Sequence, residues 1–449
     1  MAFGRFDSQE HALTDSDGIW QGIDYSNPRI KDFRNVSNHS TCLVDRESVP
    51  RMPWHDVHCR VEGQIAADLA RHFIQSWNFV KSQKSMHKPD EIPFLIPNEY
   101  EELMEPSKGL TCQVIRSAGE WSLGMPTEHS IYEAYLQLIE SSEHFIYIEN
   151  QFLVTQSSEN GFQSSPVRNR IGEALVKRII RAHRDGKAFK VVVVMPLLPA
   201  FEAAVDSPEA SSIRVIMQYQ YASISKGPNS ILGQLRAAGI DDSCQYIDFF
   251  SLRKHGILPS TGQPCTEQLY VHSKLAIFDD RVAILGSANI NDRSLMGSRD
   301  SEVCLVVEDE EFYAIDGMRV GKRVSELRMK LWREHMDLPA DLAYLNPLDE
   351  AAYAQLVKSP AATNTQIYRE LFHCVPDDSV QSWSEYTLFV ENPRVALMDR
   401  KLWAGIDGMA NLELVKGSLV VFPSNFLVKE ELSAHVLSAE YLLPTEIYI

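Results

Sequence analysis

The sequence lacks the features that hold small secreted domains together or anchor a chain in a membrane. Its seven cysteines are scattered, and no pair has C-x-x-C spacing. A disulfide framework or a zinc site is therefore not expected, and a reducing compartment is. No run approaches the roughly 18 apolar residues of a transmembrane helix, so we expect no membrane span. Residues 1–15 lack a basic start and an apolar stretch, and no signal peptide is expected there.

The chain is also short of positive charge. Its 43 Lys and Arg residues face 61 Asp and Glu residues, which gives a formal net charge of −18. Nucleic-acid binding needs a basic footprint, so no nucleic-acid partner is expected. Electrostatic attachment to anionic membranes is disfavoured as well, unless basic residues cluster locally. The 449 residues, 44% of them hydrophobic, are enough for two or three domains with a large core.

The chemistry is concentrated in residues 270–302, YVHSKLAIFDDRVAILGSANINDRSLMGSRDSE. Side-chain alternation predicts a strand from Tyr270 that places His272 and Lys274 on one face, about 7 Å apart along the backbone. A turn is predicted at residues 279–281, followed by an apolar strand over residues 282–285. The small residues that come next allow the backbone to approach a ligand closely.

These residue types suit attack on a phosphodiester. The imidazole of His272 can act as a nucleophile or as a general acid and base near neutral pH. A lysine and an asparagine beside it can hold phosphate oxygens and stabilise the charge that develops on them. A carboxylate that binds the second imidazole nitrogen could orient the ring, and the candidates are Asp279, Asp300 and Glu302. A plain surface pair of His272 and Lys274 is the alternative.

The spacing H-x-K-x4-D at His272, Lys274 and Asp279, followed by Gly286-Ser-Ala-Asn289, resembles the HKD signature of the phospholipase D superfamily. Further segments resemble eukaryotic phospholipase D, and its fungal members most. These segments are PRMPWHDV (50–57), ARHFIQSWN (70–78), IYIENQFL (146–153), VVVVMPLLPAFE (191–202) and SANINDRSLMGSRDSE (287–302). The resemblance covers most of residues 1–340.

The resemblance implies an α/β fold, with a mixed sheet flanked by helices. It implies hydrolysis of phosphatidylcholine to phosphatidic acid and choline through a phosphohistidine, with transfer of the phosphatidyl group to alcohols. No metal or other cofactor is implied for catalysis. In the roles carried over, His272 is the acid/base. Lys274 and Asn289 hold the phosphate with help from Ser287, and Asp279 and Glu302 are supporting carboxylates.

A second H-x-K is missing, although this chemistry needs two histidines, one to attack phosphorus and one to move the proton. Among 14 histidines only His272 is followed two residues later by lysine. Residues 4–7, GRFD, resemble the segment just after the family's first motif, so the nucleophile is expected outside this sequence. We favour a fragment of a complete enzyme. The alternatives are two chains that pair their histidines and an inactive protein that binds lipid.

Three regions are expected. Residues 1–105 resemble the remnant of a first phospholipase D lobe, residues 106–340 the second lobe, and residues 341–449 an extension that packs on the catalytic lobe. Within them, the four-residue spacing of apolar side chains over 65–80 predicts a helix with a buried stripe. Residues 311–336 are expected to form one long helix.

A second helix is expected over residues 167–183, and its other face and the turn after it carry basic residues that stand out in an acidic chain. A solvated helix face is one interpretation. An anionic headgroup site is the other, since each basic residue near a membrane surface contributes about 1 kcal/mol. The resemblance favours phosphatidylinositol 4,5-bisphosphate as an activator there, and a cytoplasmic protein at the membrane periphery. The residues concerned are Lys177, Arg178, Arg181, Arg184 and Lys187.

Two smaller features leave alternatives open. His55 and Asp56 invite a catalytic interpretation, but neighbouring side chains point in different directions, so we favour a structural role. Residues 149–151 lie at the end of a predicted strand. Their side chains either face the site or make structural hydrogen bonds.

Two functional rivals remain. One is a nuclease-type HKD phosphodiesterase active as a dimer, against which the net charge of −18 argues. The other is a non-catalytic lipid-binding fragment.

Overall fold

The computed structural model describes residues 12–14, 45, 47–84, 93–97, 109–158, 165–200, 203–391, 395–403, 406–432 and 448–449. The expectation for residues 4–7, and most of the predicted 1–105 region before residue 47, lie outside the described residues. Within the part of the chain that the structure describes, no helix is both long and apolar enough to cross a bilayer.

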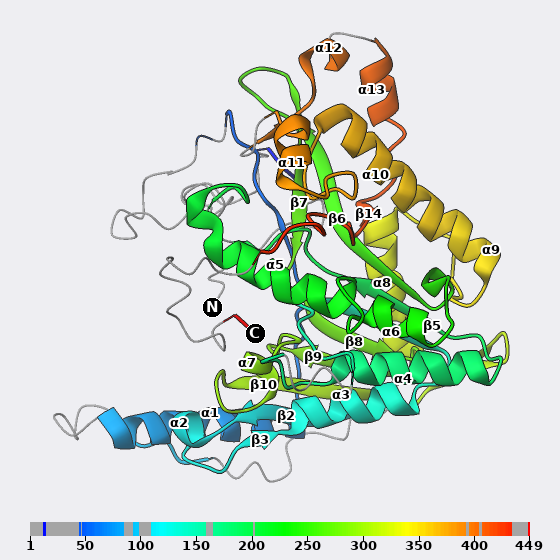
Figure 1. Cartoon of the computed structure of the whole chain (residues 1–449). Coiled ribbons are helices and arrows are strands. Elements are labelled where there is room, and N and C mark those ends of the chain that lie inside the picture. The colour runs from blue at the N-terminus through cyan, green and yellow to red at the C-terminus, as the bar shows by residue number, and fades with distance from the viewer. Residues whose placement is uncertain are drawn as a thin grey trace.

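One large mixed sheet organises the molecule (Figure 1). Its strands run in the order β1-β7-β6-β5-β4-β8-β9-β10-β2-β3, with β13 beside β7 and β14 beside β6. The strands are β1 Trp54–His55, β2 Leu110–Ala118, β3 Glu128–His129, β4 Phe145–Asn150, β5 Lys190–Val194, β6 Ile247–Ile257, β7 Pro264–Val271, β8 Lys274–Phe278, β9 Val282–Gly286, β10 Glu302–Asp309, β13 Ala396–Leu397 and β14 Leu419–Val421. The expected mixed sheet flanked by helices is therefore confirmed.

Helices cover both faces of this sheet (Figure 1). On one face lie α3 Ser130–Ser141, α4 Ile171–Arg184, α5 Ser211–Ile224 and α6 Ile231–Ala237. On the other lie α8 Lys322–Met336, α9 Glu350–Tyr353, η5 Ala354–Lys358 and the start of α10 Ser359–Phe372. The remaining helical segments are α1 Gln64–Lys84, α2 Glu120–Leu123, η3 Pro208–Ala210, η4 Ser243–Gln245, α7 Asp292–Leu295, α11 Trp383–Phe389, α12 Arg400–Trp403 and α13 Ile406–Leu412.

Strand β4 shows how the sequence pattern builds these two layers. Ile146 and Ile148 pack into the core beneath α3 and α4, and Phe145 and Tyr147 pack into the core beneath α8. All six residues of the strand are buried, as an apolar run in the middle of a sheet should be. The next residue in this alternation, Glu149, therefore points to the α8 side, into an apolar layer.

The C-terminal region continues the same sheet. Strand β14 pairs antiparallel with β6, and β13 pairs antiparallel with β7. These strand pairings agree with the expected packing of residues 341–449 on the rest of the molecule. The three domain boundaries stay predictions. The single helix expected over 311–336 is wrong. Residues 312–321 form a hairpin of β11 Phe312–Ile315 and β12 Met318–Gly321, because Asp316 and Gly317 adopt positive φ and turn the chain before α8 begins.

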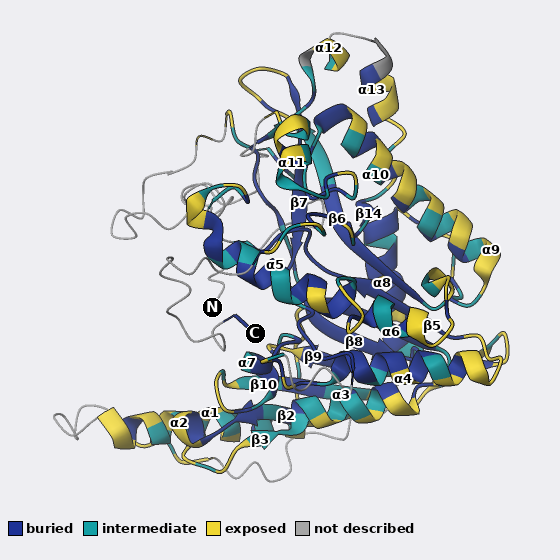
Figure 2. Ribbon diagram, in the orientation of Figure 1, coloured by how far each residue is buried: buried dark blue, intermediate teal, exposed yellow. Residues whose placement is uncertain are grey.

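The buried stripe predicted for the helix at residues 65–80 is wrong in its second half. Ile65 and Leu69 pack against the α8-side core, but Phe73 is 56% exposed and Trp77 is 38% exposed. A four-residue repeat advances 400° around a helix of 3.6 residues per turn, so the stripe drifts by about 40° at each step. After two steps, at Phe73, it has left the packed face. In Figure 2 much of α1 is accordingly coloured as intermediate or exposed.

The strand predicted from Tyr270 through Lys274 is broken where the chemistry begins. Strand β7 ends at Val271 beside β1 and β6, and β8 starts at Lys274 beside β4 and β9. His272 and Ser273 form the crossing between these two parts of the sheet. Strands β8 and β9 then form the expected hairpin, whose turn holds Asp279 at φ 53° and Asp280 at φ 51°.

Candidate active site

His272 lies at the crossing between β7 and β8, where residues 54–56 contact it from three directions. Its Nδ1 atom is 2.8 Å from Oδ2 of Asp56. Its backbone N–H donates to the carbonyl of His55 at 2.7 Å. The indole of Trp54 lies 4.7 Å from the imidazole, between ring centroids. With Nδ1 bound by a carboxylate, Nε2 is the nitrogen left to meet a reacting oxygen.

The pKa values of this pair follow from burial and charge. Burial lowers the pKa of His272, and Lys274 lowers it too, while the hydrogen bond and charge of Asp56 oppose the shift. Burial alone would raise the pKa of Asp56, but the bond to His272 and the charge of Lys274 hold it below its ordinary value. The two opposing influences on His272 suit an imidazole that both releases and takes up a proton, as a general acid/base does.

Lys274 points to the same place from the start of β8. Its ammonium donates to Oε1 of Gln151 at 2.9 Å and to the carbonyl of His272. Gln151 is fixed in turn, because its Nε2 donates to the hydroxyl of Tyr270 at 2.9 Å. Burial lowers the pKa of Lys274 to about 7, although the charges of Asp56 and Glu302 oppose this. A bound phosphate would favour the charged ammonium.

The small residues after β9 lie at the same end of the sheet. Ser287 donates to Oε2 of Glu302 at 2.5 Å, and Ser294 donates to Oε1 at 2.7 Å. Burial raises the pKa of Glu302, and these two hydroxyls oppose the rise. Among the described residues, the side-chain oxygen of Asn289 is buried without a hydrogen-bond partner. This oxygen can still accept a hydrogen bond from a donor.

Neither predicted supporting carboxylate orients His272. Asp279 accepts three backbone N–H groups, from Glu143 at 2.8 Å, His144 at 2.7 Å and Phe145 at 2.9 Å. These bonds fix the start of β4, at the opposite end of β8 from Lys274. The prediction fails because four residues of strand separate Lys274 from Asp279, and the turn points the carboxylate back at the neighbouring strand.

The other two candidate carboxylates are also occupied elsewhere. Glu302 is held by the two serines, and Asp300 forms an ion pair with Arg293 at 3.0 Å. Sequence reasoning therefore missed Asp56 as the partner of His272. The only available signal was that Asp56 stands in a segment resembling the family and next to a second histidine.

Residues 149–151 divide between the two interpretations left open from sequence. Gln151 contacts Lys274 in the site, whereas Oδ1 of Asn150 accepts the backbone N–H groups of Phe152 and Ile290. Glu149 is fully buried, and its carboxylate lies between His55 and His335.

Among the described residues, this trio is one group whose atoms are close enough to be tested as a metal site. Nε2 of His55 and Nε2 of His335 each lie 2.8 Å from a different oxygen of Glu149. Each nitrogen thus faces an oxygen at hydrogen-bonding distance. To bind a metal, the lone pairs on the two Nε2 atoms and on the carboxylate oxygens would instead have to point at one common position. The donor set is therefore a hydrogen-bonded ion cluster.

The predicted headgroup residues lie away from His272. Arg178 is buried and donates to the carbonyls of Ser142 and Glu143, so it is unavailable to a ligand. Arg181 donates to the carbonyl of Glu140. Helix α4 ends beside the start of β5, which pairs with Phe145, whereas the site lies at Asn150, roughly 17 Å along the strand at about 3.3 Å per residue. Lys177, Arg184 and Lys187 are exposed.

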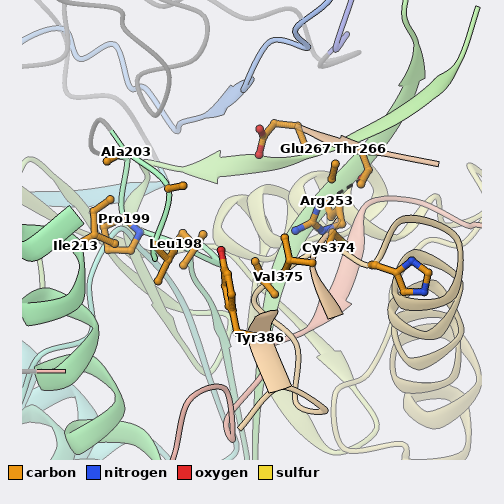
Figure 3. A pocket seen from close by; sticks show the side chains of 15 residues that line it. Leu198, Pro199, Ala203, Ile213, Arg253, Thr266, Glu267, Cys374, Val375 and Tyr386 are labelled. Carbon is orange, nitrogen blue, oxygen red and sulfur yellow. Dashed lines mark hydrogen bonds between the residues drawn. The ribbon is translucent and has the colours of Figure 1, made fainter. Parts of the chain in front are cut away.

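A pocket elsewhere in the molecule does not coincide with this site. It lies between the outer parts of β6 and β7 and residues 373–390, where Arg253, Thr266 and Glu267 gather opposite Val375 and Tyr386 (Figure 3). None of its lining residues contacts His272 or Lys274 in the bonds described above.

A histidine, a lysine and half-buried carboxylates lie together at these strand ends, and these residue types suit phosphodiester cleavage. The comparisons agree. The family model described as Phospholipase D matches residues 1–380. Human Phospholipase D1 is 38% identical over 96% of this chain and 40% of its own length. Phospholipase D1 of Saccharomyces cerevisiae is 46% identical over 76% of this chain and 21% of its own length.

A plant relative is similar over nearly the whole chain. Phospholipase D zeta 2 of Arabidopsis thaliana is 34% identical over 96% of this chain and 51% of its own length. The chain therefore belongs to the phospholipase D family of phosphodiesterase hydrolases. It spans between 21% and 51% of the length of these three relatives.

Proposed function

We propose that this chain supplies one half of a phospholipase D active site, acting on phosphatidylcholine and transferring the phosphatidyl group to water or an alcohol. The observation that carries the proposal is the contact of His272 with Asp56 at 2.8 Å, with Lys274 beside it. This is an acid/base histidine with a phosphate-binding cation, and it contains one imidazole where the chemistry needs two.

In the proposed reaction His272 moves the proton. Its Nε2–H donates to the choline oxygen as the bond from phosphorus to that oxygen breaks. A histidine supplied from outside this sequence forms the bond to phosphorus. Nε2 of His272 then accepts a proton from water or an alcohol, whose oxygen displaces the phosphohistidine and frees its nitrogen. The carboxylate of Asp56 keeps Nδ1 protonated throughout and stabilises the imidazolium that exists before the first step and forms again in the second, while His272 is neutral between them.

Lys274 and Asn289 are proposed to hold the non-bridging phosphate oxygens. The ammonium of Lys274 is buried and already directed by Gln151 towards the carbonyl of His272. The proposed role of Asn289 rests on its place in the motif Gly286-Ser-Ala-Asn289, with its side-chain NH2 group as the donor, and that of Ser287 on its place beside Glu302. No step of this mechanism needs a metal, because the charge that develops on phosphate faces a lysine and amide donors.

Complementation tests the half-site directly. Purified chain would be mixed with a full-length relative whose second-motif histidine is replaced by alanine, together with phosphatidylcholine vesicles and a primary alcohol. We expect phosphatidylalcohol from the mixture, none from either protein alone, and none when His272→Ala replaces the wild-type chain. Product from the isolated chain that disappears in His272→Ala would overturn the half-site.

We further propose that phosphatidylinositol 4,5-bisphosphate binds the exposed basic residues of α4 and that the protein works at the cytoplasmic membrane periphery. Because Arg178 is buried, the exposed residues proposed for a headgroup are Arg184, Lys187 and Lys177, the last of which also pairs with Glu173 at 2.7 Å. Flotation with vesicles that contain this lipid should fall in the double variant Arg184→Glu/Lys187→Glu. Charge reversal at Arg236, an exposed residue of α6, is the matched control. Equal flotation of all three proteins would contradict the site.

A further inference from the structure

We propose that the buried cluster of His55, Glu149 and His335 positions Asp56, and through Asp56 the imidazole of His272. The three residues form a clamp outside the phosphate-binding groups, and none of them contacts His272 with its own side chain. The catalytic meaning of this inference rests on the proposed role of His272. The contacts of the clamp itself do not depend on that role.

The segment that carries Asp56 has little secondary structure of its own to hold it. Strand β1 is two residues long and pairs with Tyr270 and Val271 at the edge of the sheet. Two backbone bonds of 2.7 Å join it to β7, one on each side of Val271. So short an edge strand does not by itself fix a side chain that must hold a 2.8 Å bond to an imidazole.

The side chain of His55 supplies the missing anchor. It points away from Asp56 and reaches two carboxylates, with Nε2 at 2.8 Å from Glu149 and Nδ1 at 3.2 Å from Glu334. Because a carboxylate accepts hydrogen bonds, both ring nitrogens carry hydrogen and the ring is an imidazolium. A fully buried cation between β4 and α8 thus stands one residue before the carboxylate that contacts His272.

Glu149 is held from all sides. Its Oε1 accepts from the hydroxyl of Tyr147 at 2.6 Å and from His335 at 2.8 Å, while its Oε2 accepts from His55. Burial alone would raise the pKa of Glu149, but the two imidazoles hold it well below its ordinary value. Burial would lower the pKa of His55, whereas the charges and bonds of Glu149 and Glu334 raise it to about 10.

The clamp reaches the second half of the site through the chain as well. Glu149 stands two residues before Gln151, which directs Lys274. The clamp therefore fixes Asp56, the partner of His272, through β1. It also fixes Gln151, the partner of Lys274, through β4. Among the side chains that the structure describes, the charged groups that act on His272 are Asp56 and Lys274, and neither belongs to the clamp. Loosening the clamp should consequently change the titration of the His272 side chain through its contact with Asp56.

The test is the titration of His272, followed by NMR on protein labelled with ¹⁵N at histidine. Asp56→Asn serves as the benchmark for loss of the carboxylate. We expect His55→Gln to move the His272 midpoint down towards that benchmark by roughly half a pH unit or more, about a threefold change in the ratio of imidazolium to imidazole. The matched control is His255→Gln, since His255 lies on β6 and pairs with Tyr368 at 3.1 Å. It should leave His272 unchanged.

A double variant keeps the test open if His55→Gln fails to fold. His55→Gln/Glu149→Gln removes both charges and leaves two amides that hydrogen-bond to each other. The proposal is overturned if either folded variant leaves the His272 midpoint at the wild-type value. It is also overturned if the ¹⁵N shifts of wild-type His55 show a neutral ring at pH 8.

This readout needs no turnover. A shifted titration together with failed complementation would therefore contradict the proposed function while leaving the clamp in place. Unshifted titration with successful complementation would contradict the clamp alone.

Discussion

At the scale of single residues, His272 depends on a carboxylate 216 positions away in the sequence. The motif itself contains Asp279 seven residues on, with a carboxylate of the right chemistry, yet its side chain binds the backbone of residues 143–145. Strand β8 starts at Lys274 and ends just before Asp279, so the carboxylate of Asp279 is too far from His272 to orient it. A carboxylate orients an imidazole only within hydrogen-bonding distance, and in this fold only Asp56 among the described residues is bonded to it.

Asp56→Asn should weaken catalysis while keeping the hydrogen bond to His272. The amide oxygen can still accept from Nδ1, but the negative charge that favours the imidazolium is lost, so the pKa of His272 falls further. In the complementation assay we expect a rate decrease on the order of 10²–10⁴, the usual contribution of a positioned general acid/base. Rates equal to wild type across the pH profile would show that Asp56 does not serve His272.

Asp279→Ala should affect stability through the start of β4. Three backbone N–H groups lose their acceptor, and each donor left unsatisfied in a partly buried place costs about 1–3 kcal/mol. We expect a loss of at least about 1–3 kcal/mol in denaturant-induced unfolding, with the His272 titration unchanged. Asp279→Asn retains one acceptor oxygen and should lose less. A shifted titration midpoint of His272 in folded Asp279→Ala would show that Asp279 does act on His272.

At the scale of elements, the hairpin β8–β9 and its neighbour β10 hold the residues proposed to bind phosphate at one end of the sheet. The sequence suggested that the small residues after β9 allow close approach of a ligand. The structure gives Gly286 a different reason. A Cβ atom there would lie 2.4 Å from the carbonyl oxygen of Val303 and 2.5 Å from the Cα atom of Cys304. The close approach is to strand β10.

Gly286→Ala should therefore separate β9 from β10. Both nearest atoms are backbone, which cannot move aside as a flexible side chain can, and such overpacking costs typically 1–3 kcal/mol or somewhat more. We expect a lower unfolding midpoint in urea together with weaker complementation, since Ser287 and Asn289 follow directly. Gly239→Ala is a useful control, because no atom lies within 4 Å of its added Cβ. Its positive φ of 85° still carries some strain. Equal stability of Gly286→Ala and wild type would contradict the close packing.

At the scale of the whole molecule, two buried ion clusters join segments far apart in the chain. Arg328 of α8 binds Asp280 in the β8–β9 turn at 2.7 Å, and Tyr344 adds its hydroxyl at 2.8 Å. The second cluster joins His55, Glu149 and His335. Each places charge inside the apolar layer beneath α8, where removing one partner costs about 3–5 kcal/mol because the other charge stays buried.

The cluster at Glu149 should make stability depend on pH. The raised pKa of His55 contributes fully below its unfolded value near 6.5, and the contribution is lost as pH rises towards about 10. The depressed pKa of Glu149 contributes above its unfolded value near 4.5 and is lost as pH falls below it. Both contributions are thus complete only between about pH 4.5 and 6.5.

Urea unfolding of wild type and His55→Gln at several pH values measures this dependence. We expect wild type to be more stable by about 3–5 kcal/mol at pH 6. The difference should shrink steadily between pH 6.5 and 10. His255→Gln provides the comparison for a histidine outside the cluster. A difference that does not vary over this range would show that His55 is not charged in the folded protein.

The sequence by itself determined the residue types and spacing of the motif, the turn at Asp279, the buried strands and the class of chemistry. These are local properties, because alternation, turn chemistry and motif spacing are set by near neighbours in the chain. The tertiary structure decided which carboxylate serves His272, what Glu149 does and where the stripe of α1 leaves the core. Those outcomes depend on crossings between strands that pair across more than a hundred residues, and no local pattern encodes such distances.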